Sequence, residues 1–109
     1  MQGFQLTFYT QQDRRHGGHP LGEWLIATAR VLGLRGATLS TAQEGFGHHG
    51  RLHAAHFFEL ADQPIAVTMA VTAEEAERLF ARLRQERLDL FYVRIPIEFG
   101  STLSDNPLT

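Results

Sequence analysis

Hydrophobic and polar residues alternate in three stretches of the chain, residues 4–9, 65–71 and 91–99. A period of two places all the apolar side chains of a stretch on one face of a β-strand. The pattern therefore predicts three strands, and we expect each apolar row to face the core.

Apolar residues recur at helical spacing in two further stretches, 20–32 and 73–86. Gly33 follows the first stretch at the position where a left-handed residue ends many helices. Thr72 and Glu75 precede and open the second stretch as the Thr-x-x-Glu capping box. Two helices are predicted.

The remaining segments are assigned with the help of polar residues and glycines. Residues 11–19 are predicted to form a polar loop that leads into Pro20, which suits the first turn of a helix. Residues 37–43 are predicted to be the second strand, and residues 51–60 a strand-like arm. The tail, 101–109, has no pattern.

The order strand, helix, strand, strand, helix, strand predicts an α+β, ferredoxin-like βαββαβ sandwich over residues 1–100, with one antiparallel sheet and both helices on one of its faces. The open face would carry small, amphipathic and polar residues: Thr7, Tyr9, Thr38, Ser40, Ala66, Thr68, Ala70, Tyr92 and Arg94. This mixture favours packing against copies of the chain, and a solvated sheet face is the alternative.

Composition excludes several classes of function. The 109 residues include no Cys, so disulfides, thiolate metal sites and a cysteine nucleophile are impossible. The formal charge is −2 and the ten basic residues, all Arg, are scattered, which argues against a nucleic-acid partner. No apolar run has the ~20 residues that span a bilayer, and we expect a cytoplasmic protein without membrane insertion. No nucleophile and base are paired by spacing, so we expect no enzymatic activity.

A glycine cluster, GFGHHG at residues 45–50, has the spacing of a dinucleotide-binding loop. The residues after it read as extended rather than helical, so this motif lacks the helix that would receive the phosphate. Two interpretations remain, a plain turn between strands and a nest of backbone N–H groups that binds an anion. Arg51 follows directly and has the bidentate geometry that suits phosphate or carboxylate.

Six histidines are present, which is a high number for this length. His16, His48 and His49 lie on predicted loops that could converge, or meet around a symmetry axis, and hold a divalent ion. The alternative to an anion-binding protein is a divalent-metal-binding trimer that uses these loop histidines and resembles the CutA-type proteins, which have the same architecture.

Four segments together resemble the domain of unknown function 190 family, a branch of the PII-like signalling proteins. They are residues 13–21 (DRRHGGHPL), 36–39 (GATL), 44–53 (EGFGHHGRLH) and Pro64, and the resemblance covers residues 4–99. It implies a ferredoxin-like homotrimer whose open sheet faces turn inward. It also implies effector binding in clefts between subunits and partner contacts through a mobile loop.

By this resemblance the partner-binding loop is residues 45–63, with a membrane transporter as the expected partner. The expected effector is a small anion, with an adenine nucleotide as candidate, and no permanent cofactor is expected. The PII nucleotide site also uses a glycine-rich loop with a lysine before the last strand, whereas residues 85–90 (QERLDL) contain neither. The residues expected at the effector site are Gly45, Gly47, Gly50, Arg51 and His53.

Overall fold

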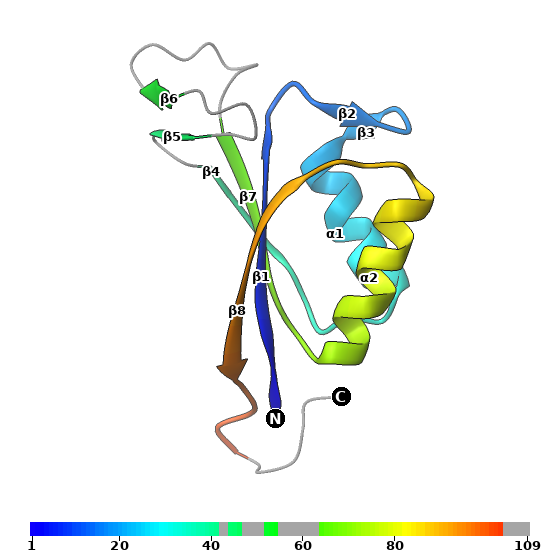
Figure 1. The fold of residues 1–109 in the computed structure, drawn as a ribbon, viewed down its shortest axis with the longest axis vertical. Helices are drawn as coiled ribbons and strands as arrows, with labels where there is room; N and C mark the ends of the chain where they lie inside the picture. Colours follow the sequence, from blue (N-terminus) through cyan, green and yellow to red (C-terminus); the bar gives the residue numbers. More distant parts are fainter. Residues whose placement is uncertain (42–43, 47–51, 55–63, 104–109) are drawn as a thin grey trace.

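The computed structural model describes residues 1–41, 44–46, 52–54 and 64–103. A four-stranded sheet carries two helices on one side (Figure 1). In chain order the elements are β1 (Gln2–Gln11), β2 (Arg15–His16), β3 (His19–Pro20), α1 (Leu21–Val31), β4 (Thr38–Thr41), β5 (Glu44–Phe46), β6 (Leu52–Ala54), β7 (Pro64–Val71), α2 (Ala73–Gln85) and β8 (Phe91–Glu98).

The main sheet has the order β4-β7-β1-β8, and every neighbouring pair in it is antiparallel. The two strands that are far apart in sequence, β1 and β8, therefore lie side by side (Figure 1). This order and the position of both helices confirm the predicted ferredoxin-like fold. Pro96 lies in β8, an edge strand of this sheet, as its missing N–H favours.

The core lies between the sheet and the two helices. Its apolar rows on β1 and β7 are those predicted from the alternation, and each helix contributes one stripe. The buried cluster comprises Leu6, Phe8, Leu25, Ala29, Leu34, Ile65, Val67, Met69, Val71, Ala76, Leu79 and Leu83.

The prediction for β8 was wrong about which of its two rows faces the helices. Tyr92 stands opposite Phe8, which is fully buried, and its ring centroid lies 6.1 Å from that of Phe8 and 4.8 Å from that of Phe80 on α2. The Arg94 guanidinium lies over the Phe4 ring, 4.9 Å from its centroid. Tyr92 and Arg94 therefore cover the edge of the core and do not lie on the open face.

The other row of β8 lies on the open face of the sheet instead. Phe91, Val93 and Ile95 are 43%, 37% and 47% exposed, although we expected them in the core. The Phe91 ring packs against Tyr9 on β1, with the two centroids 5.7 Å apart. Across the same face, the Thr7 and Thr68 hydroxyls are 3.2 Å apart. The open face is therefore more apolar than the sequence predicted.

Both helices end in the same hydrogen-bonding pattern. The N–H of Leu34 donates to the carbonyl of Ala29 at 2.9 Å, and the N–H of Leu88 donates to the carbonyl of Leu83 at 3.0 Å. These are the six-to-one hydrogen bonds of a Schellman motif. The left-handed residue is Gly33 (φ 76°) after α1, as predicted, but Arg87 (φ 55°) after α2. A residue with a Cβ is strained in this region.

Helix starts and segment bounds differ slightly from the prediction. The capping box of α2 is confirmed, since Thr72 accepts from the Glu75 N–H at 3.2 Å and Glu75 accepts from the Thr72 N–H at 2.8 Å. Helix α1 begins at Leu21, with Pro20 in the cap position before it. Helix α2 ends at Gln85.

Three predicted segments differ in detail from the structure. The segment taken as a loop, 11–19, contains the β2–β3 hairpin. The predicted second strand, 37–43, is represented by β4, and the separate strand β5 follows it. Of the predicted arm at 51–60, residues 52–54 form β6 and the rest lies outside the described residues.

Candidate functional site

Strands β5 and β6 form a separate antiparallel pair that contains Gly45, the first residue of the glycine cluster. Gly45 stands opposite His53, Glu44 opposite Ala54 and Phe46 opposite Leu52. Opposed residues in such a pair have Cα atoms about 4.5–5.5 Å apart, so Gly45 and His53 are brought together at the backbone. Two of the five expected effector residues are therefore neighbours.

The other three expected effector residues, Gly47, Gly50 and Arg51, lie outside the described residues, as do His48 and His49 of the metal alternative. The chain that joins β5 to β6, residues 47–51, holds all five. Their contribution to an anion site stays a prediction. The segment begins after β5, which contains Gly45, and ends before β6, which contains His53.

The β2–β3 hairpin was missed by the sequence interpretation. Gly17 and Gly18 both have positive φ, 59° and 80°, which is the backbone of a two-residue hairpin turn. Arg15 donates from its guanidinium to the Gly18 carbonyl across this turn. The signal was the Gly-Gly pair itself, flanked by His16 and His19, which stand opposite each other.

This hairpin is bonded to the end of α2 and to the connection that follows it. His16 Nε2 is 2.8 Å from Glu86 Oε1, and the His16 ring meets the Trp24 ring edge-on at 4.7 Å between centroids. Arg14 donates to the Asp89 carbonyl at 3.1 Å. The hydrogen bond from His16 is the largest influence on the Glu86 carboxyl and holds its pKa below the ordinary value.

His16 is the one residue of the metal alternative that the structure describes. The His16 ring is engaged by Glu86 and Trp24. Within residues 1–41, 44–46, 52–54 and 64–103, no three His, Asp or Glu side chains gather where they could hold an ion. The CutA-like alternative still depends on His48 and His49, outside these ranges.

A second charged pair lies at the opposite end of α2. The Arg35 guanidinium bonds the Glu75 carboxylate and lies 5.4 Å from the Phe99 ring centroid. Burial alone would raise the pKa of Glu75, but hydrogen bonds from the Thr72 N–H and from Arg35 outweigh it and lower the pKa below 4.5. This pair fixes the start of the helix and the segment before β4.

No helix in the described part of the chain is long and apolar enough to cross a membrane. Comparison with solved structures finds the same fold in PII-like proteins. CPII from Thiomonas intermedia K12, a nitrogen regulatory PII-like protein bound to ADP, AMP and bicarbonate, is 19% identical; the match covers 94% of this chain and 92% of CPII, with a TM-score of 0.66. A second CPII structure, bound to ADP and bicarbonate, matches at 20% identity, 94% and 93% coverage and a TM-score of 0.65.

A putative PII-like signalling protein from Thermus thermophilus matches at 17% identity, with 88% of this chain and 89% of that protein covered and a TM-score of 0.60. These similarities agree with the strand order and helix placement described above. The family model for DUF190, described as "Uncharacterized ACR", matches residues 3–91, which is most of the chain. The chain therefore belongs to the domain of unknown function 190 family, and its fold is that of the PII-like proteins.

Proposed function

We propose that this protein is a non-enzymatic PII-like regulator that forms homotrimers, binds a small anionic effector in clefts between subunits and passes that state to a partner protein. The observation that carries the proposal is the apolar row of Phe91, Val93 and Ile95 on the uncovered sheet face. Packing these side chains against copies of the chain removes them from water, and a closed symmetric assembly leaves none of the rows exposed.

Light scattering tests the assembly. We expect the particle mass of three copies of the 12.3 kDa chain. The variant Ile95→Asp places a charge in the apolar row and should give smaller particles. Val31→Asp is the matched control, because Val31 is 83% exposed on α1, away from the sheet face, and should leave the mass unchanged. A wild-type particle of 12.3 kDa would contradict the proposal.

The effector site is proposed at the glycine cluster between β5 and β6. Gly45 and His53 are paired at its base, and Arg51 precedes β6. Backbone N–H groups of a glycine-rich turn and one guanidinium are a suitable combination for phosphate. Because the similar CPII structures hold ADP, AMP and bicarbonate, an adenine nucleotide is the candidate effector, with bicarbonate as a second anion to test.

Calorimetry with ADP and AMP, with and without bicarbonate, tests this site. Arg51→Ala and His53→Ala should weaken binding, since each removes a proposed contact with the anion. Arg30→Ala is the control, because Arg30 is exposed in the last turn of α1. Equal affinities for wild type and Arg51→Ala would remove Arg51 from the site. The absence of heat with every nucleotide would refute the nucleotide as effector.

The partner contact is assigned to residues 45–63, with a membrane transporter as the first candidate by family resemblance. Effector binding and trimer formation are thus assigned to different parts of the chain, and the two can be tested independently. A Gly45→Ala, Gly47→Ala variant should lose effector binding and keep the trimer mass, since Gly45 lies in the separate β5–β6 pair and not on the main sheet. Loss of the trimer in this variant would show that the glycine cluster has a structural role instead.

A further inference from the structure

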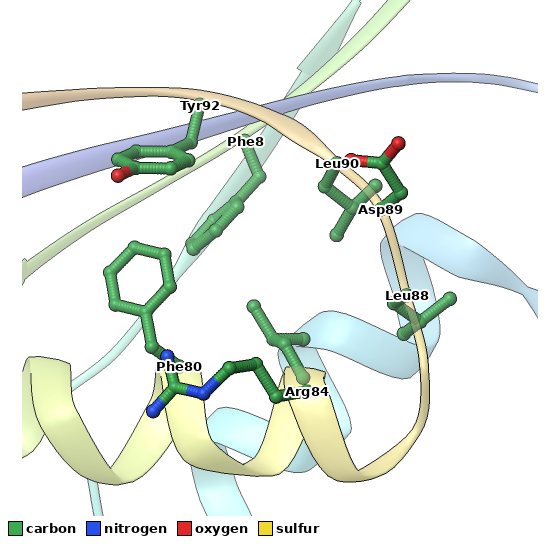
Figure 2. A pocket seen from close by; sticks show the side chains of 8 residues that line it. Phe8, Phe80, Arg84, Leu88, Asp89, Leu90 and Tyr92 are labelled. Carbon is green, nitrogen blue, oxygen red and sulfur yellow. The ribbon is translucent and has the colours of Figure 1, made fainter.

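A pocket of about 180 Å³ opens between the C-terminal half of α2, the connection after it, and β8 (Figure 2). It lies on the helix side of the sheet, whereas the apolar row proposed for assembly lies on the other side. Its lining residues are Phe8, Phe80, Leu83, Arg84, Leu88, Asp89, Leu90 and Tyr92.

Three aromatic rings form one wall of this pocket. The centroid of Phe80 lies 5.8 Å from that of Phe8 and 4.8 Å from that of Tyr92, with tilted ring planes. Phe8 is fully buried beneath, while Tyr92 is 43% exposed at the rim. Figure 2 shows the Phe80 and Tyr92 rings on the same side of the opening, facing Leu88 and Leu90 on the connection. A flat apolar group can therefore meet ring edges on one side and leucine methyls on the other.

The charges around the pocket favour an anion. The exposed Arg84 side chain lines the pocket, and in the view of Figure 2 its guanidinium extends in the direction of Phe80. The Arg94 guanidinium lies 6.0 Å from the Phe80 ring centroid, beside the same aromatic wall. Asp89 is the acidic lining residue, and its carboxylate points away from the rings in Figure 2. Arginine matches a carboxylate through paired N–H groups.

The volume limits the size of the occupant. A dry engineered cavity of about 150 Å³ holds benzene, so about 180 Å³ has room for one six-membered ring and little more. A purine with its ribose and phosphates exceeds this space. Because the pocket is open on one side, a nucleotide could place only part of itself inside, whereas a ligand with a single six-membered ring fits within it.

We propose that this pocket is a binding site for a small aromatic carboxylate, with its ring against Phe80 and Tyr92 and its carboxylate on Arg84. All of its lining residues come from one chain, and none of them belongs to β5 or β6. Three of its lining residues belong to the connection that Arg14 and His16 hold in place, through the Asp89 carbonyl and Glu86. These two hydrogen bonds therefore tie the connection that lines the pocket to the hairpin and to the residue before it.

Fluorine NMR on protein labelled with 3-fluorotyrosine tests the proposal directly. The chain has two tyrosines, and they lie on opposite faces of the sheet: Tyr92 at the pocket and Tyr9 on the open face. Titration with phenylacetate should shift the Tyr92 signal saturably, with a dissociation constant on the order of 1 mM, and leave the Tyr9 signal in place. The variant Tyr9→Phe assigns the two signals.

Two comparisons test the assigned pose. Arg84→Gln should weaken phenylacetate binding about tenfold, and Arg30→Gln, an exposed arginine on α1, should not. Benzyl alcohol, which lacks the carboxylate, should bind the wild type about tenfold more weakly than phenylacetate does. Its affinity should be the same for the wild type and for Arg84→Gln, because it makes no ion pair with Arg84. A circular dichroism spectrum establishes that each variant is folded.

Three results would overturn the proposal. The first is no shift of the Tyr92 signal up to 10 mM phenylacetate, roughly ten times the expected constant. The second is equal affinity of wild type and Arg84→Gln. The third is displacement of phenylacetate by ADP, which would make the pocket part of a nucleotide site. A failure of ADP to bind anywhere would refute the proposed effector and leave this pocket unaffected.

Discussion

The two Schellman motifs allow a matched test of backbone strain at the end of α2. Arg87 has φ 55°, and Gly33 has φ 76° at the equivalent position after α1. A left-handed conformation costs a residue with a Cβ about 1–2 kcal/mol, and a glycine avoids that cost. Glycine in turn loses about 0.4–1 kcal/mol more conformational entropy on folding. Arg87→Gly should therefore stabilise the protein by about 0.5–1 kcal/mol.

Thermal unfolding at one fixed protein concentration measures this effect. For a chain of this size about 1 kcal/mol corresponds to about 4 °C, so Arg87→Gly should raise the Tm by about 2–4 °C. Arg87→Ala keeps the strained Cβ and should stay within about 0.5 kcal/mol of the wild type. Gly33→Ala introduces the strain and should lower stability by about 1 kcal/mol. An unchanged or lower Tm for Arg87→Gly, with the expected loss in Gly33→Ala, would refute the reasoning for Arg87.

Three further predictions concern packing and charge. Gly3→Ala should destabilise by about 1–3 kcal/mol in urea unfolding, because the added Cβ would lie 2.0 Å from the Val71 carbonyl oxygen; an effect below 0.5 kcal/mol, roughly the surface range, would contradict that contact. Because the pKa of Glu75 is lower in the folded protein, its ionised carboxylate stabilises the fold above pH 4.5, and this stabilisation is lost as the pH falls through the pKa of the folded state. The difference in unfolding free energy between wild type and Glu75→Gln should therefore shrink below pH 4.5. Leu79→Ala should cost about 2–5 kcal/mol, whereas Val31→Ala, on an exposed side chain, should cost less than about 0.5 kcal/mol.

The sequence was informative where a local pattern has one physical solution. The alternation in β1 and β7 and the capping box at Thr72 each led to the observed element, because burial and capping act on residues close together in the chain. The strand order then followed from the order of the elements, since a βαββαβ chain has few compact arrangements.

The orientation of β8 could not be predicted in the same way. Both of its rows can cover apolar surface, since Tyr92 and Arg94 have long amphipathic side chains, and alternation alone does not tell which row meets the helices. The contact that decides it, Phe80 with Tyr92, joins residues on two different elements. The expectation that Phe91 and Val93 were core residues failed for this reason.

The candidate sites depended even more on tertiary structure. The pairing of Gly45 with His53 requires the register between two short strands, which the glycine spacing does not encode. The bond between His16 and Glu86 joins residues 70 positions apart. The pocket at Phe80 combines two strands, a helix and a connection, and its residues share no motif in the sequence.

The location of Pro96 on an edge strand has a consequence for how copies of this chain can meet. A free sheet edge is a template on which further strands can add without limit, and this is the route to fibres. Pro96 offers no N–H to an incoming strand, while the apolar row of the same strand points out of the sheet plane. In the proposed trimer the contacts between copies are therefore expected on the surface of the sheet and not at its rim, and such contacts can close into a finite ring.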